Sequence, residues 1–207
     1  HIPIYLTGTE PILDKSVIAM VIAAMDTALD GFNTVDVLRY LKSVLSPVPL
    51  MMADRLENYA TLWSVNGKAW TKDWTGHPNG LSDKWSDFDH RTLKELNSAR
   101  SLVIDPLVAL RDAFRNADNV SQQVSALYDF LVTIKLNERL DRLANRLDNN
   151  GDNRGAQILN QLWDILIGAL EQLHDVLGST RWDIDAFTRL FKLLLSQYDV
   201  GTIPPVL

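Results

Sequence analysis

Four of the six tryptophans of this chain lie close together, in a stretch that also carries three lysines: Trp63, Trp70, Trp74 and Trp85 with Lys68, Lys72 and Lys84. Aromatic faces interleaved with cations are typical of single-stranded nucleic-acid binding, because any base stacks on a ring while lysines meet phosphates. The same rings could instead anchor a long loop to neighbouring helices. We favour the anchor interpretation and expect Trp63 and Trp70 to be buried in either case. The candidate DNA contacts are Lys68, Lys72, Trp74, Lys84 and Trp85.

The remaining residue types form no recognisable catalytic, cofactor-binding or metal-binding pattern. The four histidines lack paired metal spacing, cysteine is absent, and neither GxxxxGK[ST] nor GxGxxG occurs. Asp148-x-Asn150-x-Asp152 begins like a calcium loop, but Asn153 occupies the glycine position, so a solvated turn is the better prediction. Asn119-Val-Ser121 matches a glycosylation sequon, yet it lies where a helix cap is needed. We therefore predict that this chain is not an enzyme by itself.

Composition indicates a globular chain with a substantial core. It has 207 residues, 46% of them hydrophobic, and a formal net charge of −6, which argues against a broad phosphate-gripping surface. No apolar run approaches the roughly 18 residues that cross a membrane. The most apolar stretch, Val17 to Met25, reads as a buried helix, and no secretory signal is evident at the start. These features predict a cytoplasmic protein with no membrane partner.

Apolar spacing of three and four predicts an all-α fold, an irregular bundle of about eight helices with short extended segments at both termini. The expected helices cover about 11–31, 34–45, 53–63, 89–116 with a kink or restart at Pro106, 121–136, 137–147, 154–177 and 183–198. Thr34, Asp89 and Asp183 are the expected caps. Residues 64–88 lose this periodicity, and 1–207 is expected to form a single helical domain. The residues expected to be buried are Leu38, Leu41, Leu56, Leu162, Leu166, Leu170, Phe187, Leu190 and Leu194.

Several ordered strings resemble one family of bacterial DNA-repair proteins. Val37-Leu-Arg-Tyr-Leu-Lys42 is followed by Leu56-Glu-Asn-Tyr59 and Gly67-Lys-Ala-Trp70. In this order and spacing they are similar to segments of the B subunit of the AddAB helicase–nuclease, also called RexAB (AddB/RexB). Ile2-Pro-Ile-Tyr5 and Thr202-Ile-Pro-Pro205 match two further segments of the same family.

The resemblance implies a helical domain inserted into a RecA-like motor domain of a UvrD-like helicase, with 1–6 and 202–207 as junctions. It implies a non-catalytic role (structural, subunit-contact or DNA-guiding) in double-strand break processing and recombinational repair. ATP, magnesium and a 4Fe-4S cluster would be bound outside these residues, and the partners would be an AddA/RexA-type subunit and DNA. The alternative function is a free-standing helical interaction or regulatory domain. An inserted domain should bring Ile2–Tyr5 and Thr202–Val206 together.

Overall fold

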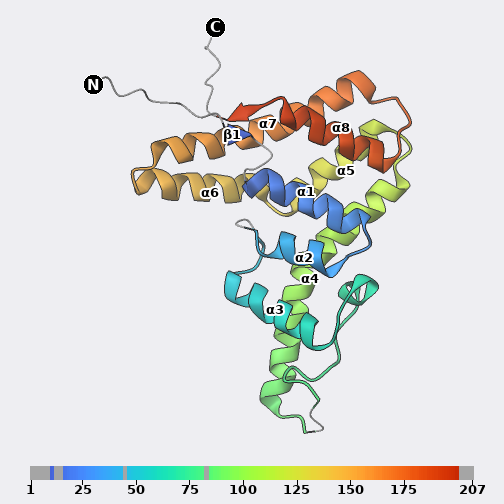
Figure 1. Cartoon of the computed structure of the whole chain (residues 1–207), viewed down its shortest axis with the longest axis vertical. Helices are drawn as coiled ribbons and strands as arrows, with labels where there is room; N and C mark the ends of the chain where they lie inside the picture. Colours follow the sequence, from blue (N-terminus) through green and yellow to red (C-terminus); the bar gives the residue numbers. More distant parts are fainter. Residues whose placement is uncertain (1–9, 12–15, 44–45, 82–83, 201–207) are drawn as a thin grey trace. The chain divides into compact units, whose positions relative to one another are not determined.

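The computed structural model describes residues 10–11, 16–43, 46–81 and 84–200 (Figure 1). The predicted all-α class is confirmed, with eight α-helices in this described part of the chain. The chain forms two compact units, which we call the central unit (residues 20–117) and the terminal unit (residues 1–19 and 118–207). The single inserted domain over 1–207 stays a prediction.

Helices α1 (Ser16–Leu29) and α2 (Thr34–Leu41) are separated by a tight turn in the central unit. Gly31 ends α1 as expected, because it adopts a left-handed φ of 72°, and the next residue, Phe32, follows with φ 65°. The cap prediction for α2 was wrong by one residue. Asn33 is the N-cap, and its side chain accepts a hydrogen bond from the Val35 N–H at 2.9 Å. The Thr34 hydroxyl instead donates to the Val65 carbonyl at 2.6 Å.

Helices α3 (Leu50–Leu62) and α4 (Asp87–Asn116) pack together in the central unit, with the 3₁₀ turn η2 (Gly67–Thr71) against α4. The prediction that Asp89 caps α4 was wrong, because Ser86 is the cap and Asp89 completes a reciprocal capping box. Pro106 does not restart the helix, which is continuous over 30 residues. A proline removes one backbone hydrogen bond, and buried Val103, Ile104 and Leu107 hold the helix on both sides of it.

The terminal unit is built from α5 (Val120–Thr133), α6 (Leu136–Asn149), α7 (Asn153–Leu177) and α8 (Ile184–Ser196). Helix α7 packs against the other three. Three side chains accept cap hydrogen bonds: Asn119 from the Gln122 N–H, Asp152 from the Gly155 N–H and Asp183 from the Ala186 N–H. The Asn119 and Asp183 caps are confirmed, and Asp152 serves as a helix cap in the turn that began like a calcium loop.

Most of the predicted core is buried. Six of the nine predicted side chains are buried, and Leu38, Leu190 and Leu194 are half-buried. In α8 the buried stripe consists of Phe187, Phe191 and Leu195, each 0% exposed. After Phe187 the prediction was wrong by one residue, because Phe191 and Leu195 are buried where Leu190 and Leu194 were expected. The Phe187 and Phe191 rings stack on each other in this buried stripe.

The two ends of the described chain meet in the terminal unit. Strand β1 (Glu10–Pro11) pairs antiparallel with β2 (Asp199–Val200), Glu10 opposite Val200 and Pro11 opposite Asp199. The end segments predicted to be neighbours, Ile2–Tyr5 and Thr202–Val206, lie outside the described residues. None of the helices in the described ranges has the length and apolarity to cross a membrane.

Candidate functional site

The tryptophan segment (residues 63–86) connects α3 to α4 in the central unit, and its aromatic rings pack on one another. The Trp74 ring stacks on Tyr59 of α3 with centroids 4.5 Å apart and planes at 8°. Trp70 meets Trp74 at 5.3 Å with planes at 59°. Trp70 is 1% exposed and Trp74 6%. These two rings are therefore part of a core that the segment builds with α3.

The indole N–H groups of Trp63, Trp70 and Trp74 each donate a hydrogen bond, as the anchor interpretation requires. Trp63 donates from Nε1 to the His77 carbonyl at 3.1 Å, and Trp70 donates to the Thr34 hydroxyl at 3.0 Å. Trp74 donates to the Ala69 carbonyl at 3.2 Å. Because a buried N–H without an acceptor costs free energy, these bonds fix the position of each ring. The burial expected of anchors is confirmed for Trp70 and Trp74. The expected burial of Trp63 was wrong: this residue is the C-cap of α3, and it is only half-buried.

Two side chains of α4 hold the backbone of the segment. The Asn97 amide accepts from the Trp74 N–H at 2.8 Å and donates to the Trp74 carbonyl at 2.9 Å. Arg100, only 3% exposed, donates to the Trp70 carbonyl at 2.8 Å and to the Asp73 carboxylate at 2.6 Å. A buried guanidinium is costly unless its donors are satisfied, so this network makes Arg100 a structural clamp and not an open cation.

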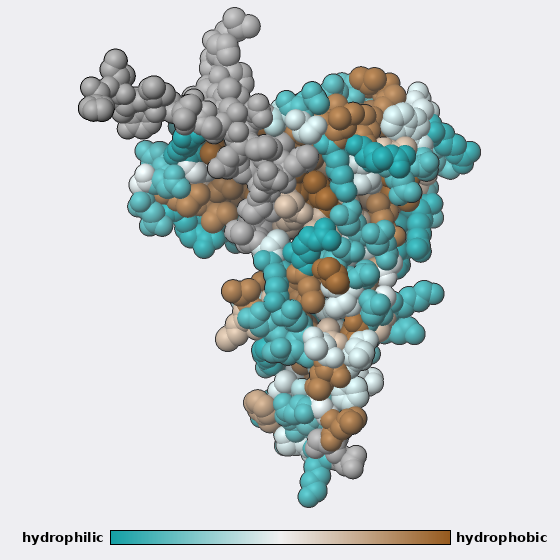
Figure 2. All heavy atoms as spheres, in the orientation of Figure 1, coloured by the Kyte–Doolittle hydropathy of each residue, from teal (hydrophilic) through white to brown (hydrophobic). Residues whose placement is uncertain are grey.

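The far end of the segment is packed differently. Trp85 stacks on His90 with centroids 4.8 Å apart and planes at 22°, and His77 meets it by an edge at 4.7 Å. Trp85 remains 37% exposed, and the neighbouring apolar side chains Leu81 and Phe88 are 98% and 65% exposed. In Figure 2, brown apolar side chains reach the surface of the molecule among teal polar ones. This end of the segment thus offers a partly open aromatic surface.

Ser86, Asp89 and His77 have the residue types of a hydrolytic triad but the wrong connections. The Ser86 hydroxyl donates to the Asp89 carboxylate at 2.5 Å, and the Asp89 carboxylate also accepts from the Ser86 N–H at 2.9 Å. His77 accepts at Nδ1 from the Asn79 N–H, and its Nε2 lies 3.5 Å from Asp89. A nucleophilic serine needs its hydroxyl on the imidazole. Here the hydroxyl is engaged by the carboxylate instead.

The groups around Asp89 stabilise its ionised carboxylate. Hydrogen bonds from the Ser86 hydroxyl, then from its backbone N–H, hold the pKa of Asp89 below its usual range, and His77 adds to the shift. Burial raises the pKa of the Tyr59 hydroxyl, which donates to the Gly76 carbonyl at 3.0 Å. Both pKa shifts arise from the contacts that hold the tryptophan segment in place. Across the described ranges, no three histidine, aspartate or glutamate side chains are grouped so as to hold a metal ion.

The predicted DNA contacts differ in their exposure to solvent. Trp74 is buried against Tyr59, so its ring is not an open stacking surface. Lys68, Lys72 and Lys84 are exposed, and Trp85 is the more open of the two tryptophans that distinguish the interpretations. Contact of any of these residues with DNA stays a prediction.

Sequence reasoning missed the residues that position the segment. Tyr59 was noted only as the end of a motif, and Asn97 and Arg100 were not singled out. The spacing of Asn97 and Arg100 by three residues places them on one face of a helix. That spacing was the available signal, but polar residues three apart are common on solvent faces, so it could not point to a buried clamp.

The described residues form an all-α protein in which the tryptophan segment is anchored by aromatic packing and by hydrogen bonds from buried side chains. Comparison with known proteins adds a likeness along the entire chain. No protein-family profile matches it. Proteins named as the B subunit of an ATP-dependent helicase/deoxyribonuclease match all of it: one from Clostridium botulinum (strain Langeland / NCTC 10281 / Type F) is 26% identical over 211 residues. Those from Clostridium kluyveri (strain NBRC 12016) and Caldanaerobacter subterraneus subsp. tengcongensis are each 27% identical, over 210 and 208 residues.

The resemblance predicted from the motifs is therefore confirmed: homologues of that name cover the whole chain. The chain spans only about 18% of the length of these relatives.

Proposed function

We propose that this chain is a non-catalytic helical domain from the B subunit of an ATP-dependent helicase/deoxyribonuclease. The observation that carries the proposal is the similarity to proteins of that name over the chain's full length. Its role in the parent complex is structural, subunit-contacting or DNA-guiding, during the processing of double-strand breaks for recombinational repair. ATP, magnesium and a 4Fe-4S cluster belong to other parts of the parent, and the partner is an AddA/RexA-type subunit.

The pairing of β1 with β2 supports the view that the domain is inserted into a host. An inserted domain leaves and re-enters its host at one place, and the pairing of Glu10–Pro11 with Asp199–Val200 brings the two ends of the described chain together. A cysteine-free chain allows a direct test. Glu10→Cys with Val200→Cys should form a disulfide, because opposite residues of an antiparallel pair have Cα atoms about 4.5–5.5 Å apart.

A matched variant, Glu10→Cys with Ser196→Cys, displaces one cysteine into α8 and should remain reduced under the same mild oxidation. Mass spectrometry reads the outcome. Equal cross-linking of the two pairs, or none in the first, would remove the support for insertion.

The non-catalytic role is tested on the chain by itself. The purified chain should neither hydrolyse ATP nor cleave DNA above the level of a mock preparation, because its sequence has no phosphate loop and Ser86 is not connected to an imidazole. Turnover that disappears when Ser86 or His77 is replaced by alanine would contradict the proposal.

The DNA-guiding part of the proposal rests on the exposed cations of the tryptophan segment. Lys68→Glu, Lys72→Glu and Lys84→Glu together should weaken DNA binding by the parent complex, since each lysine at a phosphate releases counterions. The slope of log affinity against log salt concentration is negative, and its magnitude should decrease by roughly 2–3.

The control reverses three exposed arginines in the terminal unit, Arg142, Arg146 and Arg154, for the same change of charge. Weakening by both triple variants to the same extent would mean that net charge alone acts. Unchanged binding by the lysine variant would leave a purely structural role.

A further inference from the structure

The first turn of α4 carries an aromatic ring that stands open to solvent. Phe88 is 65% exposed and makes no ring contact with the described part of the chain. Trp85, in contrast, is stacked on His90 and also meets the ring of His77. Because two imidazole rings already contact Trp85, Phe88 is the more open of these two rings to a further stacking partner.

Two cations follow Phe88 along the same helix. Arg91 and Lys94 are exposed, and neither forms an ion pair with a residue of the described ranges. Residues three apart on a helix are neighbours, with Cβ atoms about 5–6 Å apart, so these three side chains make one oblique strip. We call Phe88, Arg91 and Lys94 the α4 strip. It extends for roughly 9 Å along the helix axis.

A groove of about 410 Å³ lies beside the cations of the α4 strip. Its lining consists of one side chain of α3 and four of α4: Met52, Arg91, Lys94, Glu95 and Ser98. The carboxylate in this lining is compensated, because Glu95 pairs with Arg55 of α3 at 3.2 Å. The charges left without a partner in this groove are therefore both positive, and the Ser98 hydroxyl can donate a further hydrogen bond.

We propose that the α4 strip and its groove bind a single strand of DNA, with a base stacked on Phe88 and backbone phosphates at Arg91 and Lys94. An open aromatic ring beside unpaired cations suits such a strand, because every base has a π face and every phosphate a negative charge. The site rests on the proposed function, in which the parent handles DNA, and adds to it residues of α4 that lie outside the tryptophan segment.

One acid opposes the positive charge of the α4 strip. Asp87 is exposed in the first turn of α4, and it is a surface neighbour of Arg91 because the two residues are four apart. It forms no ion pair within the described ranges. Its negative charge should repel a phosphate at Arg91, so Asp87→Asn should strengthen the binding of DNA about twofold or more.

The test uses the whole chain and a fluorescent oligothymidylate of about 12 nucleotides, a length within the usual range of single-strand sites. Anisotropy measures the dissociation constant at low salt. Arg91→Glu with Lys94→Glu should weaken binding at least tenfold. The slope of log affinity against log salt concentration should lose roughly 1.4 of its magnitude, since two phosphate contacts disappear.

Stacking is tested at Phe88. Phe88→Ala should weaken binding at least fivefold, and Phe88→Leu should weaken it as well, because leucine is apolar but has no π face. Phe88→Trp should bind at least as tightly as the unchanged protein. The same oligonucleotide annealed to its complement should bind more weakly and should not respond to Phe88→Ala, because its bases are already stacked in the duplex.

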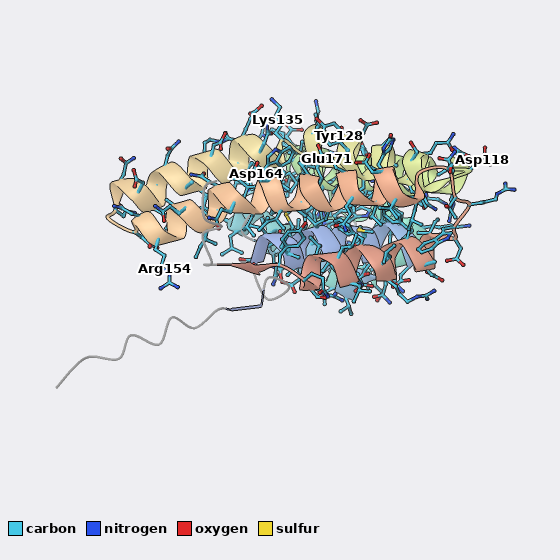
Figure 3. All side chains as sticks on the ribbon, turned by 90° about the horizontal axis from the view of Figure 1, so that it is seen from above. Asp118, Tyr128, Lys135, Arg154, Asp164 and Glu171 are labelled. Atoms are coloured by element: carbon cyan, nitrogen blue, oxygen red, sulfur yellow. The ribbon has the colours of Figure 1, made fainter. Side chains whose placement is uncertain are left out.

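Two matched controls accompany these variants. Lys135→Glu with Arg154→Glu makes the same change of charge at exposed positions of the terminal unit, where Figure 3 labels both side chains. Leu81→Ala removes a 98%-exposed apolar side chain of the tryptophan segment. Both controls should leave the affinity within about twofold, since charges beyond a Debye length are screened and leucine does not stack.

Absence of binding, equal loss in the two charge variants, or equal affinity for single strand and duplex would overturn the site. An acidic peptide that binds the α4 strip more tightly than the oligonucleotide would assign the strip to a protein partner and overturn it as well. Loss of binding only in Lys68→Glu, Lys72→Glu and Lys84→Glu together would overturn the α4 site and leave the DNA-guiding proposal intact. Loss only in the α4 variants would support the α4 site and contradict DNA contact by those lysines.

Discussion

Different kinds of contact stabilise the interiors of the two units. In the terminal unit, regular helices bury aliphatic and aromatic stripes, with α7 burying Leu162, Leu166 and Leu170. In the central unit, a segment with little regular structure is positioned by indole N–H groups, by Asn97 and by the buried guanidinium of Arg100. Apolar side chains on packed helices can be predicted from their spacing even when the predicted stripe is one residue out. An irregular segment, in contrast, needs particular hydrogen-bond donors and acceptors to hold it in place.

The largest effect should follow from emptying the aromatic core of the central unit. Trp70→Ala should cost about 3–5 kcal/mol, because it removes a 1%-exposed ring and leaves the cavity unfilled. Leu166→Ala, at a 0%-exposed position of the terminal unit, should cost about 2–5 kcal/mol. Hydrogen exchange should accelerate first across residues 63–86 in the tryptophan variant and first in α5–α8 in the leucine variant. The same exchange pattern in both would break the comparison.

Removing the clamp on α4 should have the next largest effect. Arg100→Ala deprives the Trp70 carbonyl of its charged donor, and hydrogen bonds to charged groups contribute about 1.5–3 kcal/mol. Asp73 is exposed at its side chain, so its own charge remains hydrated after the change. Arg91→Ala, at an exposed position of the same helix, is the control and should change stability by less than about 0.5 kcal/mol. Denaturant unfolding measures both variants. Equal changes in the free energy of unfolding would mean that the hydrogen bonds of Arg100 contribute no more than an exposed arginine does.

Two glycines should respond to alanine with opposite signs. A Cβ at Gly76 would run into the indole ring of Trp63, so Gly76→Ala should destabilise the central unit by about 1–3 kcal/mol. A Cβ at Gly168 in α7 would meet nothing nearer than the Tyr198 hydroxyl at 4.0 Å. Gly168→Ala should therefore stabilise the protein by about 0.5–1 kcal/mol through helix propensity. Thermal melts that shift in the same direction would show that the segment yields more easily than its contacts suggest.

The smallest effect concerns two helix caps, and it depends on pH. Ser86→Ala should cost about 1 kcal/mol at pH 7. The pKa of Asp89 is held low mainly by Ser86, so its ionised form stabilises the fold above the unfolded pKa, and this contribution is lost as pH falls through the folded pKa. The gap in melting temperature between the protein and Ser86→Ala should therefore narrow as the pH falls through the acid range in which Asp89 becomes protonated.

Asn119→Ala removes a neutral cap from α5 and is the matched control. Its cost should not vary over the same acid range, because Asn119 has no titrating group. A gap for Ser86→Ala that is also constant with pH would show that Asp89 does not depend on Ser86.

The sequence by itself determined the helical class, most of the buried positions, the caps at Asn119 and Asp183 and the resemblance to AddB-type proteins. These follow from local rules, since apolar spacing, cap chemistry and motif order are all readable along the chain. The capping box Ser86-x-x-Asp89 is also readable along the chain, and the cap prediction at Asp89 overlooked it. Tertiary structure decided the boundary at Asn33, because the Thr34 hydroxyl donates to the distant Val65 carbonyl. It also decided that Arg100 is buried and that Met52 of α3 lines one groove with Arg91 and Lys94 of α4. Such outcomes depend on which groups from distant segments come into contact, and periodicity carries no information about those partners.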